Sequence, residues 1–274
     1  MKLIFLIILF FLTAGILYKN NRAHLYPEMN AVTLEIPQIL NTNMGRGNIR
    51  IAIMGDLHVK QSSVAYEELS ALLESILASE PEMIFLLGDY TKSGHLISDM
   101  EAHRTEVAKR LSALTRLPVS AVLGNYETLS GPDDWNNALS AAGISVLHNA
   151  IKTLNIKGRK FCIRGLGDAY TKQFRHVDFP QHCADAAKIT LTHDPAGALK
   201  TGISGLIFAA HTHCGQIRLP VLGALWTPTE APQSATCGLY EDNTRMLWVT
   251  AGVGTSVFPV RLGAQSQWDL ITLK

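Results

Sequence analysis

The sequence predicts one α/β domain built around a parallel sheet, preceded by an N-terminal transmembrane helix. Two observations indicate the fold class. From residue 49 onward, short apolar runs alternate with amphipathic segments, and the first of them follow the order strand, helix, strand, helix, strand. A third observation concerns chemistry, because polar side chains that can bind metal ions directly follow five of the apolar runs.

Length and charge limit the possible functions. The chain has 274 residues, of which 47% are hydrophobic and 17% charged, with a net charge of +1. This is enough for one large domain with a buried core. The balanced charge argues against a protein that grips nucleic acid through many phosphate contacts. A small phosphorylated substrate stays possible, because a metal centre can supply positive charge locally.

The N-terminus carries an almost unbroken apolar run, Leu3–Leu17, between Lys2 and the polar stretch Lys19–Arg22. A helix of that length rises about 22 Å, and lysines that snorkel at both ends bring it close to the roughly 30 Å of a bilayer core. A cleaved signal peptide is the competing interpretation, but no small-x-small cleavage site follows the run. We expect a single-pass anchor in the cell (inner) membrane over residues 1–20, a connector over 21–48 and the domain over 49–274. Positive charge on both sides leaves the membrane face open.

The elements of the domain follow from the spacing of apolar residues. Ile49–Met54 is predicted as a buried strand, Val64–Ala78 as a helix and Met83–Leu87 as the next strand. Further helices are expected at Asp99–Leu114 and Asp134–Ala142, and further strands at Val119–Leu123, Ile144–Leu147, Phe161–Gly165, Lys188–Thr192, Leu206–Ala210, Met246–Thr250 and Trp268–Leu273. Residues 152–165, interrupted by Lys157-Gly158-Arg159, are predicted to form a hairpin.

The cysteines are widely spread and form no CxxC pair. They are Cys162, Cys183, Cys214 and Cys237. An even number allows disulfides, but no spacing resembles a disulfide framework or a zinc knuckle. We expect ordinary thiols.

Five of the predicted strands end in a potential metal ligand. In chain order these ligands are Asp56 with His58, Asp89, Asn125, His193, and His211 with His213. Because the carboxyl ends of strands in α/β sheets are where ligands bind, we expect these side chains to converge. A glycine stands directly before the polar residue at three of the five turns, which permits a tight turn at a crowded site.

The donor types indicate the ions. Carboxylate oxygens, an amide oxygen and neutral imidazoles suit Mn²⁺, Fe²⁺ or Zn²⁺. Seven donors exceed what one tetrahedral ion uses, so two divalent ions that share a ligand are the economical inference. Two such ions can hold a phosphoryl group and stabilise an in-line displacement.

The ordered set Gly55-Asp56-Leu57-His58, Gly88-Asp89, Gly124-Asn125, His193 and Ala210-His211-Thr212-His213 resembles the signature of the calcineurin-like metallophosphoesterases. The resemblance covers residues 49–274. It implies that Asp56, His58 and His213 bind one metal ion. It further implies that Asn125, His193 and His211 bind the other, and that Asp89 bridges the two. The implied fold is a four-layer αββα sandwich with the site at the strand ends.

A narrower resemblance concerns the substrate. The N-terminal anchor and the stretches His211–Gln216, Leu219-Pro220, Cys237–Tyr240, Ala251–Thr255 and Pro259–Arg261 resemble the membrane-associated bacterial branch, whose members are compared with UDP-2,3-diacylglucosamine hydrolases of lipid A synthesis. This implies a phosphodiester or pyrophosphate substrate, and a lipid as one carrier of it. The apolar loop Leu219–Trp226 suits an acyl chain or a membrane surface, and ordinary core packing is equally open.

The sequence departs from the family pattern at one chemically important position. The family has Gly-Asn-His where this chain has Gly124-Asn125-Tyr126, and that histidine is the candidate proton donor to the leaving group. Tyr126 can donate a hydrogen bond but is a poorer acid near neutral pH. His95, six residues after Asp89, is an alternative candidate for the proton donor, and a surface histidine is the competing interpretation. Arg261 and Gln216 are candidate phosphate contacts, Arg261 because a guanidinium fork matches phosphate oxygens.

These features lead to one principal hypothesis and two rivals. The principal hypothesis is a membrane-anchored, two-metal hydrolase of phosphodiester or pyrophosphate bonds in a lipid-linked or UDP-sugar-lipid substrate. One rival is a phosphoesterase for soluble nucleotides or phosphoproteins. The other is a metal-binding module without catalysis, which the replacement at Tyr126 makes conceivable.

Overall fold

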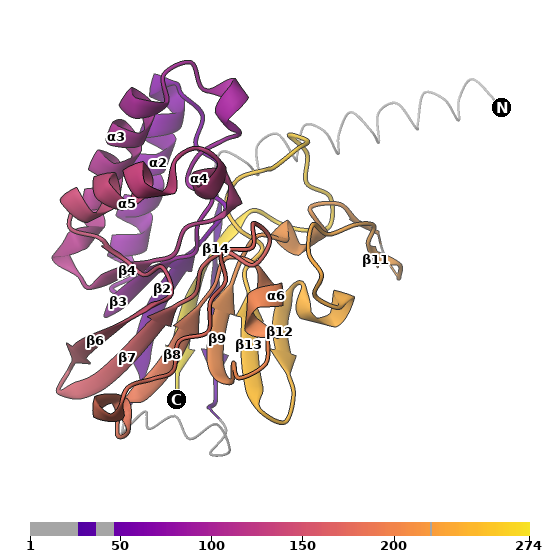
Figure 1. Ribbon diagram of the computed structural model, residues 1–274. Coiled ribbons are helices and arrows are strands. Elements are labelled where there is room, and N and C mark those ends of the chain that lie inside the picture. Colours follow the sequence, from indigo (N-terminus) through magenta and orange to yellow (C-terminus); the bar gives the residue numbers. More distant parts are fainter. Residues whose placement is uncertain (1–26, 37–46, 220) are drawn as a thin grey trace.

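The computed structural model describes residues 27–36, 47–219 and 221–274, so the predicted anchor over residues 1–20 lies outside the described residues. Over those ranges, none of the helices has the length and apolar character needed to cross a membrane. Two six-stranded sheets pack face to face, and helices cover the outer face of one of them (Figure 1).

The first sheet has the order β1-β14-β2-β3-β4-β5. Its strands are β1 (Glu28–Leu34), β14 (Gln267–Leu273), β2 (Ile49–Met54), β3 (Met83–Leu86), β4 (Val119–Ala121) and β5 (Ser145–Val146). As predicted, β2 to β5 run parallel. The C-terminal strand β14 pairs antiparallel with β2, and β1 adds to it in parallel. The predicted connector therefore includes a strand, whose half-exposed, alternating pattern is typical of a sheet edge.

The second sheet has the order β12-β13-β9-β8-β7-β6. Its strands are β6 (Ala150–Ile156), β7 (Arg159–Gly165), β8 (Ala187–Leu191), β9 (Gly205–Ala209), β12 (Gly238–Glu241) and β13 (Arg245–Val249). Its four inner strands are parallel, and β6 and β12 flank them antiparallel. The predicted hairpin is β6–β7, and its turn places Lys157 and Gly158 at φ 50° and 75°, as a two-residue hairpin turn requires. A small separate hairpin joins β10 (Arg218–Leu219) to β11 (Gly223–Ala224).

Helices α2 (Ser63–Ala78), α3 (Met100–Leu111) and α5 (Pro132–Ala141) cover the outer face of the first sheet (Figure 1). Their apolar faces pack on strand residues such as Ala52 and Ile84 in one core cluster. A second cluster, which includes Phe85 and Phe208, fills the space between the two sheets. The short helix α4 (Asn125–Leu129) follows β4 and buries Asn125 and Glu127.

The outer face of the second sheet differs from the expected helical layer. Within the described part of the chain, its helical cover is a single turn, α6 (Pro195–Ala198), with 3-10 turns and loop residues beside it. Ala198, Ile203 and Ala235 from these segments pack on Ile207 and Leu247 of the sheet. Small side chains let the loops approach closely, so three full layers and a thin fourth one result.

All four cysteines are paired, so the expectation of free thiols was wrong. Cys162 of β7 is bonded to Cys183, and Cys214 is bonded to Cys237. The partners lie 21 and 23 residues apart in the sequence. Such spacings carry no local motif, and only the tertiary fold brings each pair together.

Candidate metal centre

The predicted ligands converge at the carboxyl edge of the two sheets. They follow β2, β3 and β4 of the first sheet and β8 and β9 of the second, as the sequence predicts. Every one is buried, and the most accessible of them, Asn125, is 8% exposed. The site therefore lies on the seam where the two sheets meet.

The ligands form two groups of three whose donor atoms lie within 4.8 Å of one another. One group is Asp56, His58 and His213; the other is Asp89, His193 and His211. Asp89 also connects the groups, because its Oδ2 atom lies 3.4 Å from His193 Nε2 and 3.7 Å from His58 Nε2. Asn125 belongs to the second group, since its Oδ1 atom lies 3.1 Å from His193 Nε2.

Five of these ligands have left-handed backbone conformations. The φ angles are 53° at Asp56, 46° at His58, 55° at Asp89, 70° at His211 and 50° at His213. Such conformations cost on the order of 1–3 kcal/mol each outside glycine and persist where the surroundings impose them. Here hydrogen bonds impose them: Asp56 N donates to Gly88 O, and His58 N donates to Asp89 O.

Two glycines leave the space in which the Asp89 turn fits. A Cβ atom at Gly124 would lie 2.2 Å from Asp89 Oδ1, and one at Gly88 would lie 2.4 Å from Gly124 N. Gly88 also has a φ of 89°, which favours glycine. The turns Gly88-Asp89 and Gly124-Asn125 thus pack directly against each other, and both need glycine for this contact.

Backbone carbonyls orient three of the four imidazoles. His58 Nδ1 donates to Thr91 O at 3.3 Å, His193 Nδ1 to Leu87 O at 2.7 Å and His211 Nε2 to Pro228 O at 2.6 Å. Because a carbonyl oxygen only accepts, the ring nitrogen named here carries a proton, and the other ring nitrogen faces the site and has a free lone pair whenever the ring is neutral. This second layer of hydrogen bonds is typical of metal-binding histidines.

The fourth imidazole has a different partner. Arg261 Nη2 lies 3.0 Å from His213 Nδ1, and the same nitrogen donates to Gly252 O at 3.0 Å. A guanidinium only donates, so in this arrangement Nδ1 of His213 accepts and the neutral ring carries its proton on Nε2. Arg261 also donates to backbone carbonyls, so it does not need His213 as an acceptor. When the ring proton of His213 moves from Nε2 to Nδ1, Nε2 becomes free to bind a metal ion.

Burial and charge set the protonation of the group. Burial lowers the pKa of His58 to about 3, and burial together with Arg261 lowers the pKa of His213 well below its usual value. Burial opposes charge on His193 as well, but the field of Asp89 outweighs it and raises the pKa of His193 well above the usual value. Burial also raises the pKa of Asp56 to about 7. The neutral rings of His58 and His213 can bind a divalent cation directly, whereas His193 must first lose the proton that Asp89 stabilises; bound cations would in turn compensate the carboxylate charge.

Glu127 holds the two halves of the site together, a role that the sequence did not reveal. Its Oε2 atom accepts from Asp89 N at 2.7 Å and Gly124 N at 2.9 Å, and its Oε1 atom accepts from Tyr90 N at 2.8 Å and Thr91 N at 3.3 Å. The carboxylate is fully buried. The one feature of the sequence that could have indicated this role is the position of Glu127 directly after Asn125-Tyr126. An acidic residue near the start of a short helix is common, so this position alone does not predict it.

A cavity of about 430 Å³ opens over the ligands. Its lining includes Asp89, Asn125, His211 and His213, together with Tyr126 and Gln216. The hydroxyl of Tyr126 lies 3.2 Å from Ser256 Oγ, and burial raises the pKa of this phenol, so it stays protonated near neutral pH. Tyr170, which the sequence did not single out, also lines the cavity, with its ring 4.9 Å from that of His211.

The two candidate phosphate contacts are engaged with the protein itself. Gln216 Nε2 donates to Phe258 O at 2.6 Å, and its Oε1 atom accepts from Ser256 N at 2.9 Å. Arg261 is 1% exposed and lies behind His213, outside the residues that line the cavity. Both side chains position site elements in this structure, and their contact with substrate stays a prediction. His95 is exposed and pairs with Ser93 Oγ at 2.7 Å.

A third cluster of potential ligands has another explanation. Cys162, His182 and Cys183 lie close together, but the two cysteines form a disulfide. Their sulfur atoms are therefore not available as thiolates.

Comparison with known proteins decides the family. A family model described as calcineurin-like phosphoesterase matches residues 49–215. The chain belongs to the calcineurin-like phosphoesterase family. It is accordingly a phosphoric ester hydrolase, which agrees with the metal-binding chemistry of its site.

Relatives of this calcineurin-like phosphoesterase come from distant organisms. Phosphodiesterase YaeI of Escherichia coli is 27% identical over 233 residues, which cover 82% of each chain. The uncharacterized metallophosphoesterase YkuE of Bacillus subtilis is 28% identical over 269 residues, which cover 96% of this chain and 92% of YkuE. Among solved structures, a 5'-nucleotidase precursor from Thermus thermophilus matches with a TM-score of 0.49 and 15% identity, covering 82% of this chain and 55% of that one.

Proposed function

We propose that this chain is a dinuclear metallophosphodiesterase that hydrolyses phosphodiester or pyrophosphate bonds. The observation that carries the proposal is the position of Asp89 between two groups of three ligands, with Oδ2 3.4 and 3.7 Å from histidines of the two groups. One carboxylate shared by two neighbouring donor sets is the arrangement that a pair of metal ions requires.

The residues present fit two divalent ions. Asp56, His58 and His213 would hold one, Asn125, His193 and His211 the other, and Asp89 would contact both. Nitrogen and oxygen donors of this kind suit Mn²⁺, Fe²⁺ or Zn²⁺. When bound, such a pair supplies Lewis-acid stabilisation of charge on the phosphoryl group and activates water for attack.

The chain's own residues contribute position and a proton donor. Glu127 and the two glycines fix Asp89 and Asn125 in one rigid turn. Tyr126 presents its hydroxyl to the cavity, where it can donate a hydrogen bond to the leaving-group oxygen. Because its pKa is raised, it suits a leaving group that needs little protonation.

We further propose that the natural substrate carries an apolar group. Beside the ligands, the cavity is lined by Leu225, Trp226, Val257 and Phe258. This wall suits an acyl or prenyl chain, as expected for a lipid-linked or UDP-sugar-lipid substrate, better than it suits a soluble nucleotide or a phosphoprotein. Residues 1–20 would then hold the enzyme at the membrane where such substrates lie.

The disulfides support a location of the domain outside the reducing cytoplasm. Two bonds that engage all four cysteines form and persist in oxidising compartments. We therefore place the domain on the outer side of the anchoring membrane. Maleimide labelling of intact cells tests this placement, with all four cysteines expected to react after reduction only.

The test of the function is metal-dependent hydrolysis by the full chain in mild detergent. After removal of metal with a chelator, we expect hydrolysis of bis(p-nitrophenyl) phosphate to return on addition of Mn²⁺ or Zn²⁺, with two ions bound per chain. Asp89→Asn should abolish both activity and the occupancy of the second ion. The matched control is Asp185→Asn, an exposed aspartate before β8 at the far edge of the sheet.

Two outcomes would contradict the proposal. Two bound ions without hydrolysis of any phosphodiester would support the rival of a silent metal-binding module. Undiminished activity of the Asp89→Asn enzyme would rule out the shared ligand. A comparison of UDP-diacylglucosamine with soluble nucleotide diesters then separates the lipid-linked from the soluble substrate class.

A further inference from the structure

Exposed apolar side chains gather around the mouth of the metal-site cavity. Twelve large apolar residues are exposed in the described part of the chain, and six of them lie on two loops. We call these six the apolar rim: Val221, Leu222, Leu225, Trp226, Val257 and Phe258, with exposed fractions from 61% to 106%. Leu225, Trp226, Val257 and Phe258 also line the cavity that holds the ligands. The rim and the site therefore share one opening.

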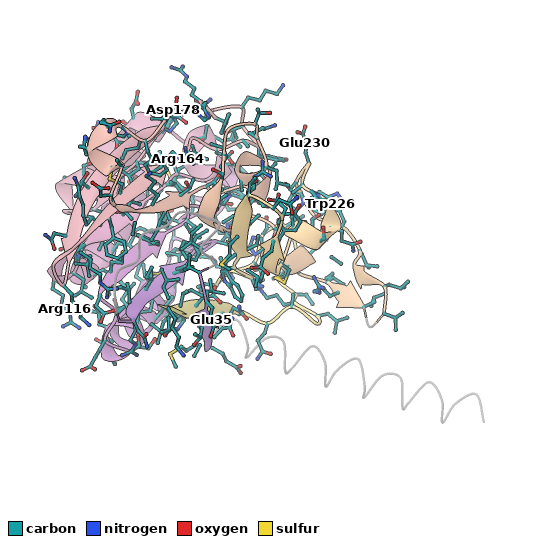
Figure 2. All side chains as sticks on the ribbon, turned by 90° about the horizontal axis from the view of Figure 1, so that it is seen from below. Glu35, Arg116, Arg164, Asp178, Trp226 and Glu230 are labelled. Atoms are coloured by element: carbon teal, nitrogen blue, oxygen red, sulfur yellow. A yellow bond between two sulfur atoms is a disulfide. The ribbon has the colours of Figure 1, made fainter. Side chains whose placement is uncertain are left out.

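The rim is confined to one side of the molecule. The opposite edge of the sheets is formed by polar turns, at residues 79–82, 112–118, 157–158, 199–204 and 242–244, and none of the exposed large apolar residues lies there. Figure 2 shows Trp226 and Arg116, which belongs to one of these turns, on opposite sides of the molecule. The β10–β11 hairpin, which carries Val221 and Leu222 at its turn, projects beyond both sheets (Figure 1).

Hydrogen bonds hold the two rim loops in place. The amide group of Gln216 bonds to the backbone of Ser256 and Phe258, which ties the loop after β9 to the loop after β13. Lys92, 8% exposed, donates to Ser256 O at 3.1 Å and to Thr255 O. Arg218 N donates to Leu262 O at 2.7 Å. The apolar side chains are thus presented to the outside by a fixed scaffold rather than by loosely attached loops.

The N-terminal part of the chain leaves the domain at the same edge. Strand β1 begins at Glu28, whose backbone N–H donates to Ser266 O at the start of β14. Pro27 lines a second cavity, of about 330 Å³, together with the ligand His58 and with Thr255 and Pro259 of a rim loop. Nine residues separate Pro27 from the apolar run Leu3–Leu17, a length of chain that spans about 30 Å at most. The described chain therefore begins beside the mouth of the site, and the apolar run precedes it by only nine residues in the sequence.

We propose that this edge docks on a lipid bilayer, with the apolar rim inserted among the headgroups and the mouth of the metal site facing the membrane. Aromatic and branched apolar side chains on a rigid protrusion suit the interface, where apolar groups leave water while neighbouring polar atoms stay hydrated. The substrate phosphodiester is then taken directly from the lipid surface. This inference rests on the proposed phosphodiesterase function for its substrate, and on the rim and β1 for its orientation.

Trp226 is a built-in reporter of the docked orientation. The chain has four tryptophans, and the other three, Trp135, Trp248 and Trp268, are 0%, 9% and 2% exposed, whereas Trp226 is 67% exposed. The full chain is reconstituted in phosphatidylcholine and phosphatidylglycerol vesicles with brominated acyl chains, which quench only nearby indole rings. We expect a blue-shifted emission that bromine quenches, and we expect Trp226→Phe to lose both signals.

A control moves the reporter to the other edge. In the Trp226→Phe background, Asp185→Trp places an indole at an exposed position before β8. Its emission should be unshifted and unquenched. Equal quenching at both positions, or none at Trp226, would overturn the docked orientation. A Trp226 that is shielded in vesicle-free buffer by a second copy of the chain, as judged by sedimentation, would overturn it too.

A kinetic experiment distinguishes an effect on membrane docking from an effect on the hydrolysis step. Val221→Ser combined with Leu222→Ser changes the hairpin turn, which does not line the cavity. We expect about tenfold slower hydrolysis of a long-chain phosphodiester in vesicles, because two apolar side chains no longer insert. Turnover of bis(p-nitrophenyl) phosphate in water should be unchanged, and an equal loss on both substrates would contradict the proposal. If neither substrate is hydrolysed by the parent chain, the proposed function fails, while the quenching result still decides the orientation.

Discussion

Strands β2 to β5 of the first sheet and the four inner strands of the second sheet end at one edge of the molecule and begin at the other, and the two edges differ in chemistry. The carboxyl edge holds buried ligands in left-handed backbone conformations, surrounded by exposed apolar side chains. The opposite edge consists of tight polar turns. One is the turn at Lys157-Gly158, and in another the side chain of Asp242 accepts from Thr244 N and Arg245 N. The hydrogen-bonded strands between the edges supply the rigidity that lets one edge hold strained conformations. Matched substitutions at the two edges test this difference.

The largest effect is expected from glycine substitutions. Gly124→Ala places a Cβ atom 2.2 Å from Asp89 Oδ1, so the shared ligand must move. We expect a loss of activity of about a hundredfold, since displaced catalytic groups lose their alignment. Gly158→Ala, at the opposite edge, has open space around its Cβ position, so only its φ of 75° is unfavourable. It should cost about 1–2 kcal/mol of stability, by denaturant unfolding, and leave activity unchanged.

Glutamate substitutions should give the next largest difference. Each oxygen of Glu127 accepts from two backbone amides, so Glu127→Gln turns an amide group toward two N–H donors in either orientation. We expect metal affinity to fall about 10- to 100-fold, as is typical for groups that support metal ligands. Glu82 at the opposite edge accepts from Arg50 N and pairs with the exposed Lys157. Glu82→Gln should leave metal binding, measured by titration calorimetry, within error of the parent.

A substitution at Tyr126 tests whether the residue at this position donates a proton to the leaving group. Tyr126→His restores the residue type that the family resemblance leads us to expect, with a pKa nearer neutrality. We expect about tenfold faster hydrolysis of alkyl phosphodiesters, whose leaving groups need a proton, and little change with p-nitrophenyl esters. Tyr170→His is the control, because Tyr170 lines the same cavity against His211. A similar gain from both substitutions would show that a specific proton donor at position 126 is not the cause.

The smallest effect is expected from the two disulfides, which should contribute similarly to stability but differently to activity. They close chain segments of 21 and 23 residues, so each should stabilise the fold by about 3 kcal/mol. Cys162–Cys183 joins the middle of β7 to the turn before β8, whereas Cys214 directly follows His213. Alanine replacement of either pair should therefore lower the melting temperature similarly. Only the replacement of Cys214 and Cys237 should also reduce activity several-fold, and equal activities would show that this bond serves stability alone.

The sequence by itself determined where the candidate metal ligands gather. Asp56, Asp89 and His193 each stand one or two residues beyond a buried apolar run, and the period of such runs reveals where a strand ends. Because parallel strands end at a shared edge, the convergence of the ligands followed without knowledge of the packing. The turn at Lys157-Gly158 was equally local, and the structure confirms it.

Tertiary structure decided what depends on contacts between distant segments. The cysteine pairs, the four amides that meet Glu127 and the addition of β1 to β14 each join residues whose spacing follows no local rule. Arg261 shows the limit most clearly, because the sequence suggests a phosphate contact and the fold buries it behind His213. Local sequence specifies where a strand ends and which group follows it, since these depend on neighbouring residues. The partner of a buried polar group is set only when the whole chain has packed, because burial itself is a property of the assembled fold.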